Sequence, residues 1–287
     1  MKIIFVPVAD RPECARALRA AFDLARKLEA SVIGCHMRPH RHSEISLSQY
    51  FSEAILGDDA RALYAEWQRK SNSRSSNASR ALYETVAESA GFAMSKRLKA
   101  SPVAMWQEKV GSPDKLMAIS GPVSDLLVVS RPKFGGGKLA GLFMLSALME
   151  SSRPVLILPQ SCPARVGERV CIAWNQSAEA ARAVAAAMPV LQLAKQVTIV
   201  SCGPENRIGP KAKQLADYFG AWGVHADRQI TRGVNVDEEL IASYRKTNSD
   251  LLLMGAYSRN RWREVVFGGT SHYMLRHANI PVLMLHT

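Results

Sequence analysis

The chain has little cysteine and no paired cysteine motif. Its five cysteines among 287 residues are odd in number and include no Cys-x-x-Cys spacing, which excludes a disulfide framework and a cysteine-rich zinc site. No apolar run approaches the length of a membrane span, and the apolar stretch 1–8 is too short for a secretory signal because Asp10 and Arg11 follow it. We therefore expect a protein of the reducing cytoplasm that has no membrane partner.

Arrangements typical of catalysis are also missing. The sequence shows no Ser-His-Asp or Cys-His grouping and no carboxylate pair placed for acid-base chemistry, so no catalytic residue is predicted. His36, His40 and His42 stand in a polar stretch without matching cysteines or carboxylates, and a surface loop explains them better than a metal site. No metal ligand is predicted.

What the chain has in excess is positive charge, with a formal net charge of +12. Much of it is dispersed, and one basic stretch, 69–80, is rich in serine and asparagine and has no aromatic residues. This composition predicts a solvated linker. The charge fits an anionic ligand but does not indicate a specific nucleic-acid partner.

The most informative feature is an internal repeat. Residues 125–129 match 250–254, residues 153–158 match 280–285, and 13–17 match 179–183. Copies this long are whole domains, and the length suits two domains with a core each. Proline and glycine between 159 and 167 mark the boundary. We expect domains at 1–160 and 167–287, the first enlarged by a helical insertion.

In the second copy, short apolar runs alternate with helical patterns, which indicates an α/β domain with a mainly parallel sheet. The predicted strands are 169–174, 196–201, 224–231, 251–254 and 282–285, and the predicted helices are 177–194, 211–221, 237–246 and 270–277. Ser177 is the expected N-cap of the first helix. Leu215, Phe219 and Trp222 are expected to pack against the sheet. In the insertion of the first copy we expect a polar loop at 36–48 and helices near 60–70 and 81–98, followed by a strand at 103–109 and a helix at 113–119.

Glycines and small residues follow the strand at 251–254. Gly255 and Ser258 come directly after it, and Gly268, Gly269, Thr270 and Ser271 open the next helix. Glycine permits close backbone approach to a ligand, and the start of a helix favours phosphate. Ligands of open α/β sheets bind beyond the strand carboxyl ends, where strand order reverses. The turn 175–177 would form the other wall. The alternative is that the glycines only shape turns.

The pattern resembles the universal stress protein family. Gly255-x2-Ser258-x9-Gly268-Gly269-Thr270-Ser271, followed by 281–284, is similar to the family's Gly-x2-Gly-x9-Gly-Ser/Thr signature, and 173–180 is similar to its first-strand turn. The resemblance covers nearly the whole chain as a tandem pair. It implies two doubly wound domains, each with a five-stranded sheet of order 3-2-1-4-5, and an ATP site that does not exclude ADP or AMP. The implied ligand contacts are Ala173, Asn175, Ser177, Gly255, Ser258, Gly268, Gly269, Thr270 and Ser271.

Both copies depart from the signature. In the second, Ser258 replaces a glycine, Gly269 replaces a hydroxyl residue and Asn175 replaces the aspartate of many binders. In the first, Ser130 stands at the position of Gly255, and Gly141, at the position of Gly268, lacks a following serine or threonine. We expect a degenerate site there.

These features predict a universal stress response protein that acts as an adenine-nucleotide-responsive regulatory module without turnover. A slow ATPase or phosphotransferase is one alternative, for which only Asp10 and Glu264 offer carboxylates near a phosphate loop. A nucleotide-independent interaction protein is the other. The apolar segments 154–158 and 281–285 predict pairing of the two domains through their last strands, and a homodimer of tandem chains is expected.

Overall fold

The computed structural model describes residues 1–40, 65–69, 73–131, 138–161, 165–256 and 269–286. The chain divides into two compact units, Met1–Gln160 and Ser161–Thr287, which we call the N-terminal and C-terminal units. The predicted site residues Ser258 and Gly268, together with His42 and Glu264, lie outside the described residues.

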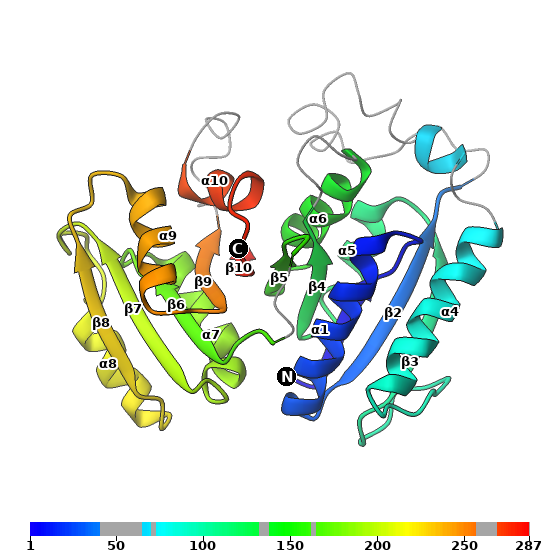
Figure 1. Ribbon diagram of the computed structural model, residues 1–287, viewed down its shortest axis with the longest axis horizontal. Coiled ribbons are helices and arrows are strands. Elements are labelled where there is room, and N and C mark those ends of the chain that lie inside the picture. The colour runs from blue at the N-terminus through cyan, green and yellow to red at the C-terminus, as the bar shows by residue number, and fades with distance from the viewer. Residues whose placement is uncertain (41–64, 70–72, 132–137, 162–164, 257–268, 287) are drawn as a thin grey trace. The chain divides into compact units, whose positions relative to one another are not determined.

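The N-terminal unit alternates strands and helices (Figure 1). Its elements are β1 (Ile3–Pro7), α1 (Pro12–Leu28), β2 (Ser31–Arg38), α4 (Ser73–Ser89), β3 (Ala104–Val110), α5 (Pro113–Ser120), β4 (Leu126–Ser130), α6 (Lys138–Glu150) and β5 (Val155–Leu158). The strands run in the order β3-β2-β1-β4-β5, and every pair is parallel.

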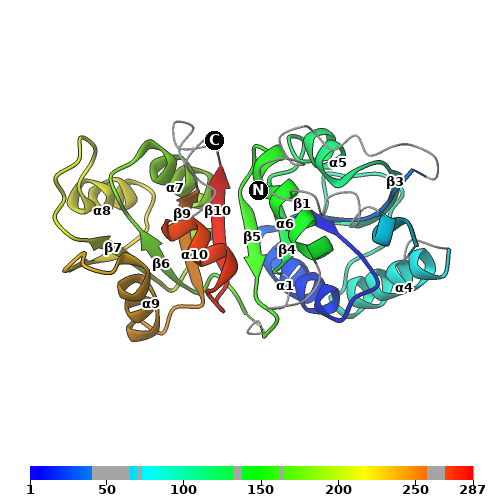
Figure 2. The ribbon, with the colours of Figure 1, turned by 90° about the horizontal axis from the view of Figure 1, so that it is seen from above.

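The C-terminal unit repeats this plan. Its elements are β6 (Arg169–Ala173), α7 (Ala178–Leu191), β7 (Gln196–Cys202), α8 (Ala212–Ala221), β8 (Ala226–Thr231), α9 (Val236–Lys246), β9 (Leu251–Ala256), α10 (Thr270–Arg276) and β10 (Val282–His286). The order is β8-β7-β6-β9-β10, again with parallel pairs. Helices α7 and α8 cover one face of this sheet, and α9 and α10 cover the other (Figure 2).

The predicted fold class is therefore confirmed. Numbered within each unit, the strand order is 3-2-1-4-5 in both. The strands β4, β5, β9 and β10 are buried along almost their whole length, which is why they are almost continuous runs of valine, leucine, isoleucine and methionine. The described residues include no helix that is both long and apolar enough to cross a bilayer.

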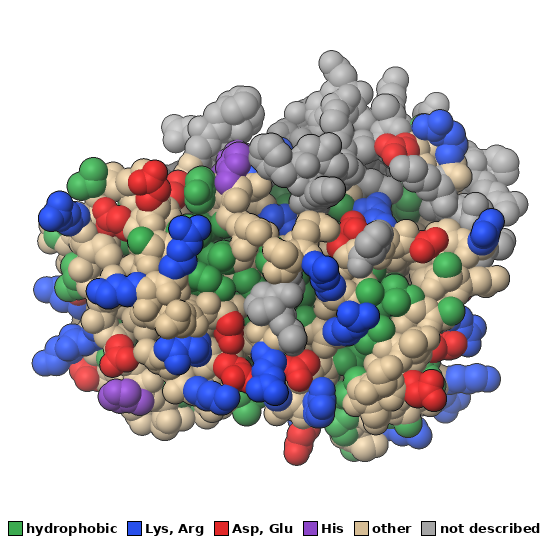
Figure 3. Space-filling model, viewed as in Figure 1, with side chains coloured by type: hydrophobic (Ala, Val, Ile, Leu, Met, Phe, Trp, Pro, Cys, Tyr) green, Lys and Arg blue, Asp and Glu red, His purple; other side chains and the backbone are tan. Residues whose placement is uncertain are grey.

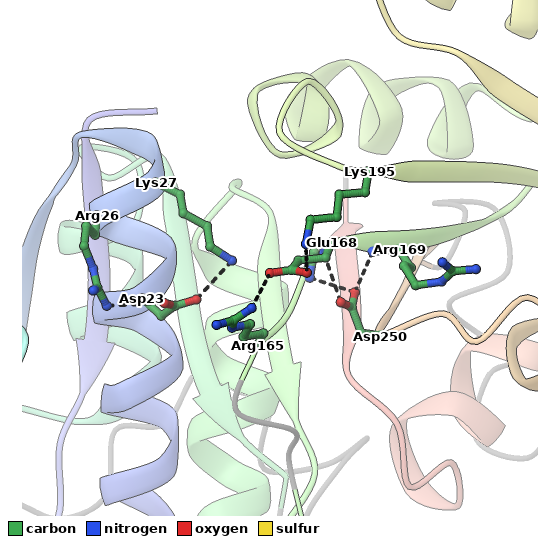
Figure 4. A network of polar contacts seen from close by, with 9 residues as sticks. Asp23, Arg26, Lys27, Arg165, Glu168, Arg169, Lys195 and Asp250 are labelled. Atoms are coloured by element: carbon green, nitrogen blue, oxygen red, sulfur yellow. Dashed lines mark hydrogen bonds and ion pairs between the residues drawn. The ribbon is translucent and has the colours of Figure 1, made fainter.

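The repeated aspartates Asp125 and Asp250 have a structural role. Asp250 accepts hydrogen bonds from the backbone amides of Gly167, Glu168 and Arg169 at 2.8 to 3.1 Å, which fixes the start of β6 (Figure 4). Asp125 likewise accepts from the amides that begin β1. A carboxylate at this place satisfies amides that have no strand partner. Glu168 itself pairs with Lys195 at 2.7 Å.

The prediction of a solvated linker at 69–80 is wrong, because residues 73–80 form the first part of α4. The helix expected at 81–98 starts at Ser73 and ends at Ser89 instead. Ser76 and Ser79 are buried together with Tyr83, so small polar residues form the packed face of the helix. Tertiary packing has overridden their weak helix propensity. Of the helix expected near 60–70, residues 65–69 are described and are helical.

Two further side chains differ from expectation. His36 lies in β2 and is only 3% exposed, with Nδ1 bonded to the Val8 carbonyl, so it is not a surface residue. Trp222 is 47% exposed, whereas Leu215 and Phe219 are buried as expected. Trp222 is the C-cap residue of α8, where the chain has already left the packed helical face.

Candidate functional site

The C-terminal unit has a cavity of about 710 Å³ at the carboxyl ends of β6, β7 and β9. These strand ends point upward in Figure 1, and the first residues of α9 and α10 also line the cavity. Strand order reverses at β6, because β7 and β9 lie on its two sides. The predicted site residues that line it are Ala173, Asn175, Ser177, Gly255, Gly269, Thr270 and Ser271. The structure therefore brings all the described members of the predicted set together.

The turn between β6 and α7 forms one wall. Ser177 is the N-cap of α7, since its hydroxyl accepts a hydrogen bond from the Ala180 amide at 3.1 Å, which confirms that prediction. The Asn175 side-chain oxygen accepts from the Ser177 amide at 3.2 Å. Both side-chain oxygens thus take part in holding the turn itself.

Gln176 joins this turn to the loop 203–210. Its amide nitrogen donates to the Arg207 and Gly209 carbonyls, both at 3.1 Å, and its oxygen accepts from the Arg207 amide at 3.2 Å. The residue is buried and has a left-handed backbone with φ of 63°. The indole of Trp174 also donates to the Pro210 carbonyl at 2.8 Å. A loop that is polar in sequence is therefore a fixed wall.

Gly255 serves helix packing. A Cβ atom at this position would lie 2.7 Å from the Ala180 backbone nitrogen and 2.9 Å from the Glu179 Cβ. The start of α7 thus passes so close to the end of β9 that only glycine fits without a shift of backbone. This observation favours the alternative reading of Gly255 as a residue that shapes the fold.

The segment Gly269 to Ser271 forms the side opposite the loop 203–210. Gly269 is the N-cap of α10 with φ of 118°, and no described side chain caps the helix. Thr270 and Ser271, which carry hydroxyl groups, are half-buried residues of the cavity lining. This part of the wall offers hydrogen-bond donors to a polar or anionic ligand.

The loop between β8 and α9 is held by Glu239. Its carboxylate accepts hydrogen bonds from the Thr231 hydroxyl and from the amides of Gly233 and Val234, the latter two at 2.8 Å. The Thr231 bond contributes most and, with the amides, lowers the pKa of Glu239 to about 2. The network fixes the first turn of α9, from which Val236 and Leu240 line the cavity.

The sequence reading missed several lining residues. Glu179 and Glu205 are carboxylates at the cavity, and apolar surface comes from Val200, Val236, Leu240 and Met254. Glu205 Oε1 accepts from the Ser201 hydroxyl at 2.8 Å and from the Ala212 amide at 2.7 Å. Glu205 follows β7, and Val236 and Leu240 follow β8. Because parallel strands end at the same edge of a sheet, these positions could have indicated that the residues lie near the site.

Among the described residues, the corresponding place in the N-terminal unit holds a cavity of about 40 Å³. Phe143 of α6 and the buried Cys14 help to line it. Burial raises the pKa of the Cys14 thiol to about 11. Ser130 stands at the end of β4, and its hydroxyl donates to the Glu13 carbonyl at 3.3 Å.

Fold and cavity together define an α/β protein of two units with doubly wound parallel sheets and an open cavity in the C-terminal unit. Residues 204–286 match the sequence model of the universal stress protein family. This match lies within the C-terminal unit.

Solved structures share the fold. A universal stress protein from Archaeoglobus fulgidus DSM 4304 is 16% identical with a TM-score of 0.68, covering 99% of this chain and 98% of that one. A putative universal stress protein from Pseudomonas aeruginosa UCBPP-PA14 is 15% identical with a TM-score of 0.58, covering 100% and 93%. A protein of unknown function from Pseudomonas aeruginosa PAO1 is 15% identical with a TM-score of 0.56, covering 100% and 92%. No curated protein matches this sequence.

Proposed function

We propose that the C-terminal unit binds an adenine nucleotide, with ATP as the first candidate. The protein would then act as a regulatory module that responds to this nucleotide. The observation that carries the proposal is the cavity of about 710 Å³ at the strand ends where sheet order reverses. That volume lies within the range of small-molecule sites, about 300–1,000 Å³. The match to the universal stress protein family falls on the same unit.

The lining suggests how the ligand lies. The phosphates would contact Gly269, Thr270 and Ser271, where hydroxyl and backbone donors are available. The base would pack against Val200 and Leu240 on the β7 side of the cavity. Ala173, Asn175 and Ser177 would contact the ligand from the turn between these two regions. Gly255 contributes indirectly, because it lets α7 approach β9.

Binding without turnover is proposed because the carboxylates at the cavity already have partners. Glu205 accepts two hydrogen bonds through Oε1, and Glu179 lies 3.6 Å from the Arg182 guanidinium. Phosphoryl transfer needs a side chain that is free to position the attacking water.

Isothermal titration calorimetry of the full chain with ATP, ADP and AMP tests the proposal. Ser271→Glu places a carboxylate beside the proposed phosphate region, and we expect at least about 30-fold weaker binding from charge repulsion. Ala242→Glu adds the same charge to the exposed side of α9 and should leave the affinity unchanged.

Two results would replace the proposal. Absence of binding by all three nucleotides would favour a nucleotide-independent interaction protein. Release of phosphate from ATP with Mg²⁺ that disappears in Ser271→Glu would instead show a slow ATPase.

The proposed cellular location rests on the cysteines. The four described cysteines are unpaired, which fits the reducing cytoplasm. A homodimer and the pairing of domains through their last strands stay predictions, and light scattering of the full chain measures the former.

A further inference from the structure

The loop between α4 and β3, residues 90–103, carries positive charge without compensating acid. No aspartate or glutamate occurs between Glu88 and Glu108. Lys96, Arg97 and Lys99, which we call the basic triad, are all exposed. The loop lies at the amino end of β3, at the lower right of Figure 1, where Figure 3 shows basic side chains together with acidic ones of this unit.

Backbone hydrogen bonds hold this loop in place. The Ser95 amide donates to the Ala104 carbonyl at 2.8 Å, and the Ala104 amide donates to the Ala93 carbonyl at 3.0 Å. The Ser95 hydroxyl donates to the Arg97 carbonyl at 2.6 Å and accepts from the Arg97 amide at 3.2 Å. The basic triad therefore extends from an ordered turn.

The same loop exposes two large apolar side chains. Met94 is 44% exposed and Leu98 is 41% exposed. Phe92, by contrast, packs edge-on against Phe22 of α1 with ring centroids 5.0 Å apart, which anchors the loop. Met94 and Leu98 are therefore exposed on a turn whose backbone is held by hydrogen bonds.

Some exposed basic residues elsewhere have carboxylate partners. Arg80 pairs with Glu84 at 2.8 Å, and Lys195 pairs with Glu168 at 2.7 Å. No member of the basic triad pairs with a carboxylate of the described residues. Its charge is thus available to an external anionic surface.

We propose that this loop docks the protein onto an anionic lipid surface. Basic side chains attract acidic headgroups, while adjacent aliphatic side chains enter the boundary between headgroups and acyl chains. A nucleic acid fits less well, because the one aromatic ring of residues 90–103, Phe92, is occupied by Phe22 and no ring is left to stack on bases. The phosphate backbone of a nucleic acid would also offer Met94 and Leu98 no apolar surface to contact. This role was not expected from the sequence, which supported no membrane partner.

The size of the effect follows from the charge. Each basic side chain near an anionic bilayer strengthens binding by about fivefold, so the basic triad supplies on the order of 100-fold. Salt should weaken this contribution strongly, since the Debye length falls from about 10 Å at 0.1 M to about 3 Å at 1 M. The part due to Met94 and Leu98 should resist salt.

Vesicle flotation of the full chain tests the proposal, with phosphatidylcholine alone and with about 30% phosphatidylglycerol. We expect on the order of 100-fold preference for the anionic vesicles. Replacing the three residues of the basic triad by glutamate should abolish it, and replacement by glutamine should remove most of it. The matched control makes the same change of charge at three exposed basic residues of the C-terminal unit, Lys213, Arg228 and Lys246, and should retain binding within about threefold.

Three outcomes would overturn the inference. Equal binding to both vesicle types removes the role of charge. Equal loss in the control variant shows a general charge effect. Binding of a duplex oligonucleotide that depends on the basic triad, without vesicle binding, assigns the loop to nucleic acid. Leu98→Ser supports the apolar part if it weakens the binding that remains at high salt, and contradicts it if that binding is unchanged.

Discussion

The two units share a strand order but differ in the space at their strand ends. The C-terminal cavity measures about 710 Å³ and its N-terminal counterpart about 40 Å³. Aligned on Pro154 and Pro281, α6 begins more than one helical turn earlier than α10, and Phe143 stands where Thr270 stands. Ser130 stands where Gly255 stands. A few side chains and one helix start therefore decide whether the same sheet leaves room for a ligand.

The difference between Gly255 and Ser130 reflects how closely a helix approaches the end of the strand. The Ser130 hydroxyl reaches the Glu13 carbonyl, so α1 leaves space for a side chain at the end of β4. At Gly255 the equivalent space is filled by the backbone of α7. Part of what resembles a nucleotide signature is thus a requirement of helix packing.

The largest effect is expected for Gly255→Ala. The added methyl group meets backbone atoms that cannot rotate away, and overpacking of this kind costs about 1–3 kcal/mol. Hydrogen exchange of β9 and α7 measures the loss of stability. Ser130→Gly is the reciprocal change and should cost less than about 1 kcal/mol. Equal costs in the two units would show that the packing difference is absent.

Gln176→Ala should have the next largest effect. It removes three hydrogen bonds that join the β6–α7 turn to the loop 203–210, for a loss of about 1–2 kcal/mol. The amide of Arg207 should exchange about tenfold faster. Asp10 occupies the matching position of the N-terminal unit and is exposed, so Asp10→Ala should change stability by less than about 0.5 kcal/mol. An unchanged Arg207 amide would contradict the role of Gln176.

Acid should loosen the β8–α9 loop through Glu239. Its pKa in the folded protein is about 2, below the ordinary 4.5, so the ionised form is favoured by folding. The stabilisation is complete above about pH 4.5 and is lost as pH falls through 2. The Gly233 and Val234 amide resonances should titrate near 2 in an NMR pH series. Glu239→Gln should abolish that titration, and a midpoint near 4.5 would refute the network.

The smallest effect concerns Cys202, which lines the C-terminal cavity and is half-buried. Burial raises the pKa of its thiol, so alkylation by N-ethylmaleimide should be slow at neutral pH and faster when alkaline. Bound ATP should slow the alkylation of Cys202 several-fold, as measured by mass spectrometry. The Cys162→Ser variant is used because Cys162 lies outside the described residues. Cys14 at the N-terminal cavity should be unaffected, and loss of this difference would place the ligand elsewhere.

Much of the fold could be read from the sequence. The matched segments around Asp125 and Asp250 revealed the duplication, and continuous apolar runs revealed the parallel strands. The interval 69–80 could not be read, because Ser76 and Ser79 pack against the body of the protein without an apolar pattern. The prediction that Trp222 packs against the sheet failed for the opposite reason. This large apolar residue has helical spacing, but it lies past the end of the packed face of α8.

The candidate site was read less completely. Residues that follow β6 and β9 were identified by their glycines and small side chains. Glu205 and Leu240 were not, because their residue types do not mark a cavity wall and only their positions after β7 and β8 pointed to it.

By itself, the sequence determined the two α/β units and the edge of the sheet at which a ligand would bind, because periodicity and parallel connections fix both. Only the tertiary structure decided how much space the described residues leave at that edge, about 710 Å³ in one copy and about 40 Å³ in the other. The volume left there depends on where α6 and α10 begin and on how closely α1 and α7 approach their sheets. These are properties of packed backbones, to which a local residue pattern contributes only a part.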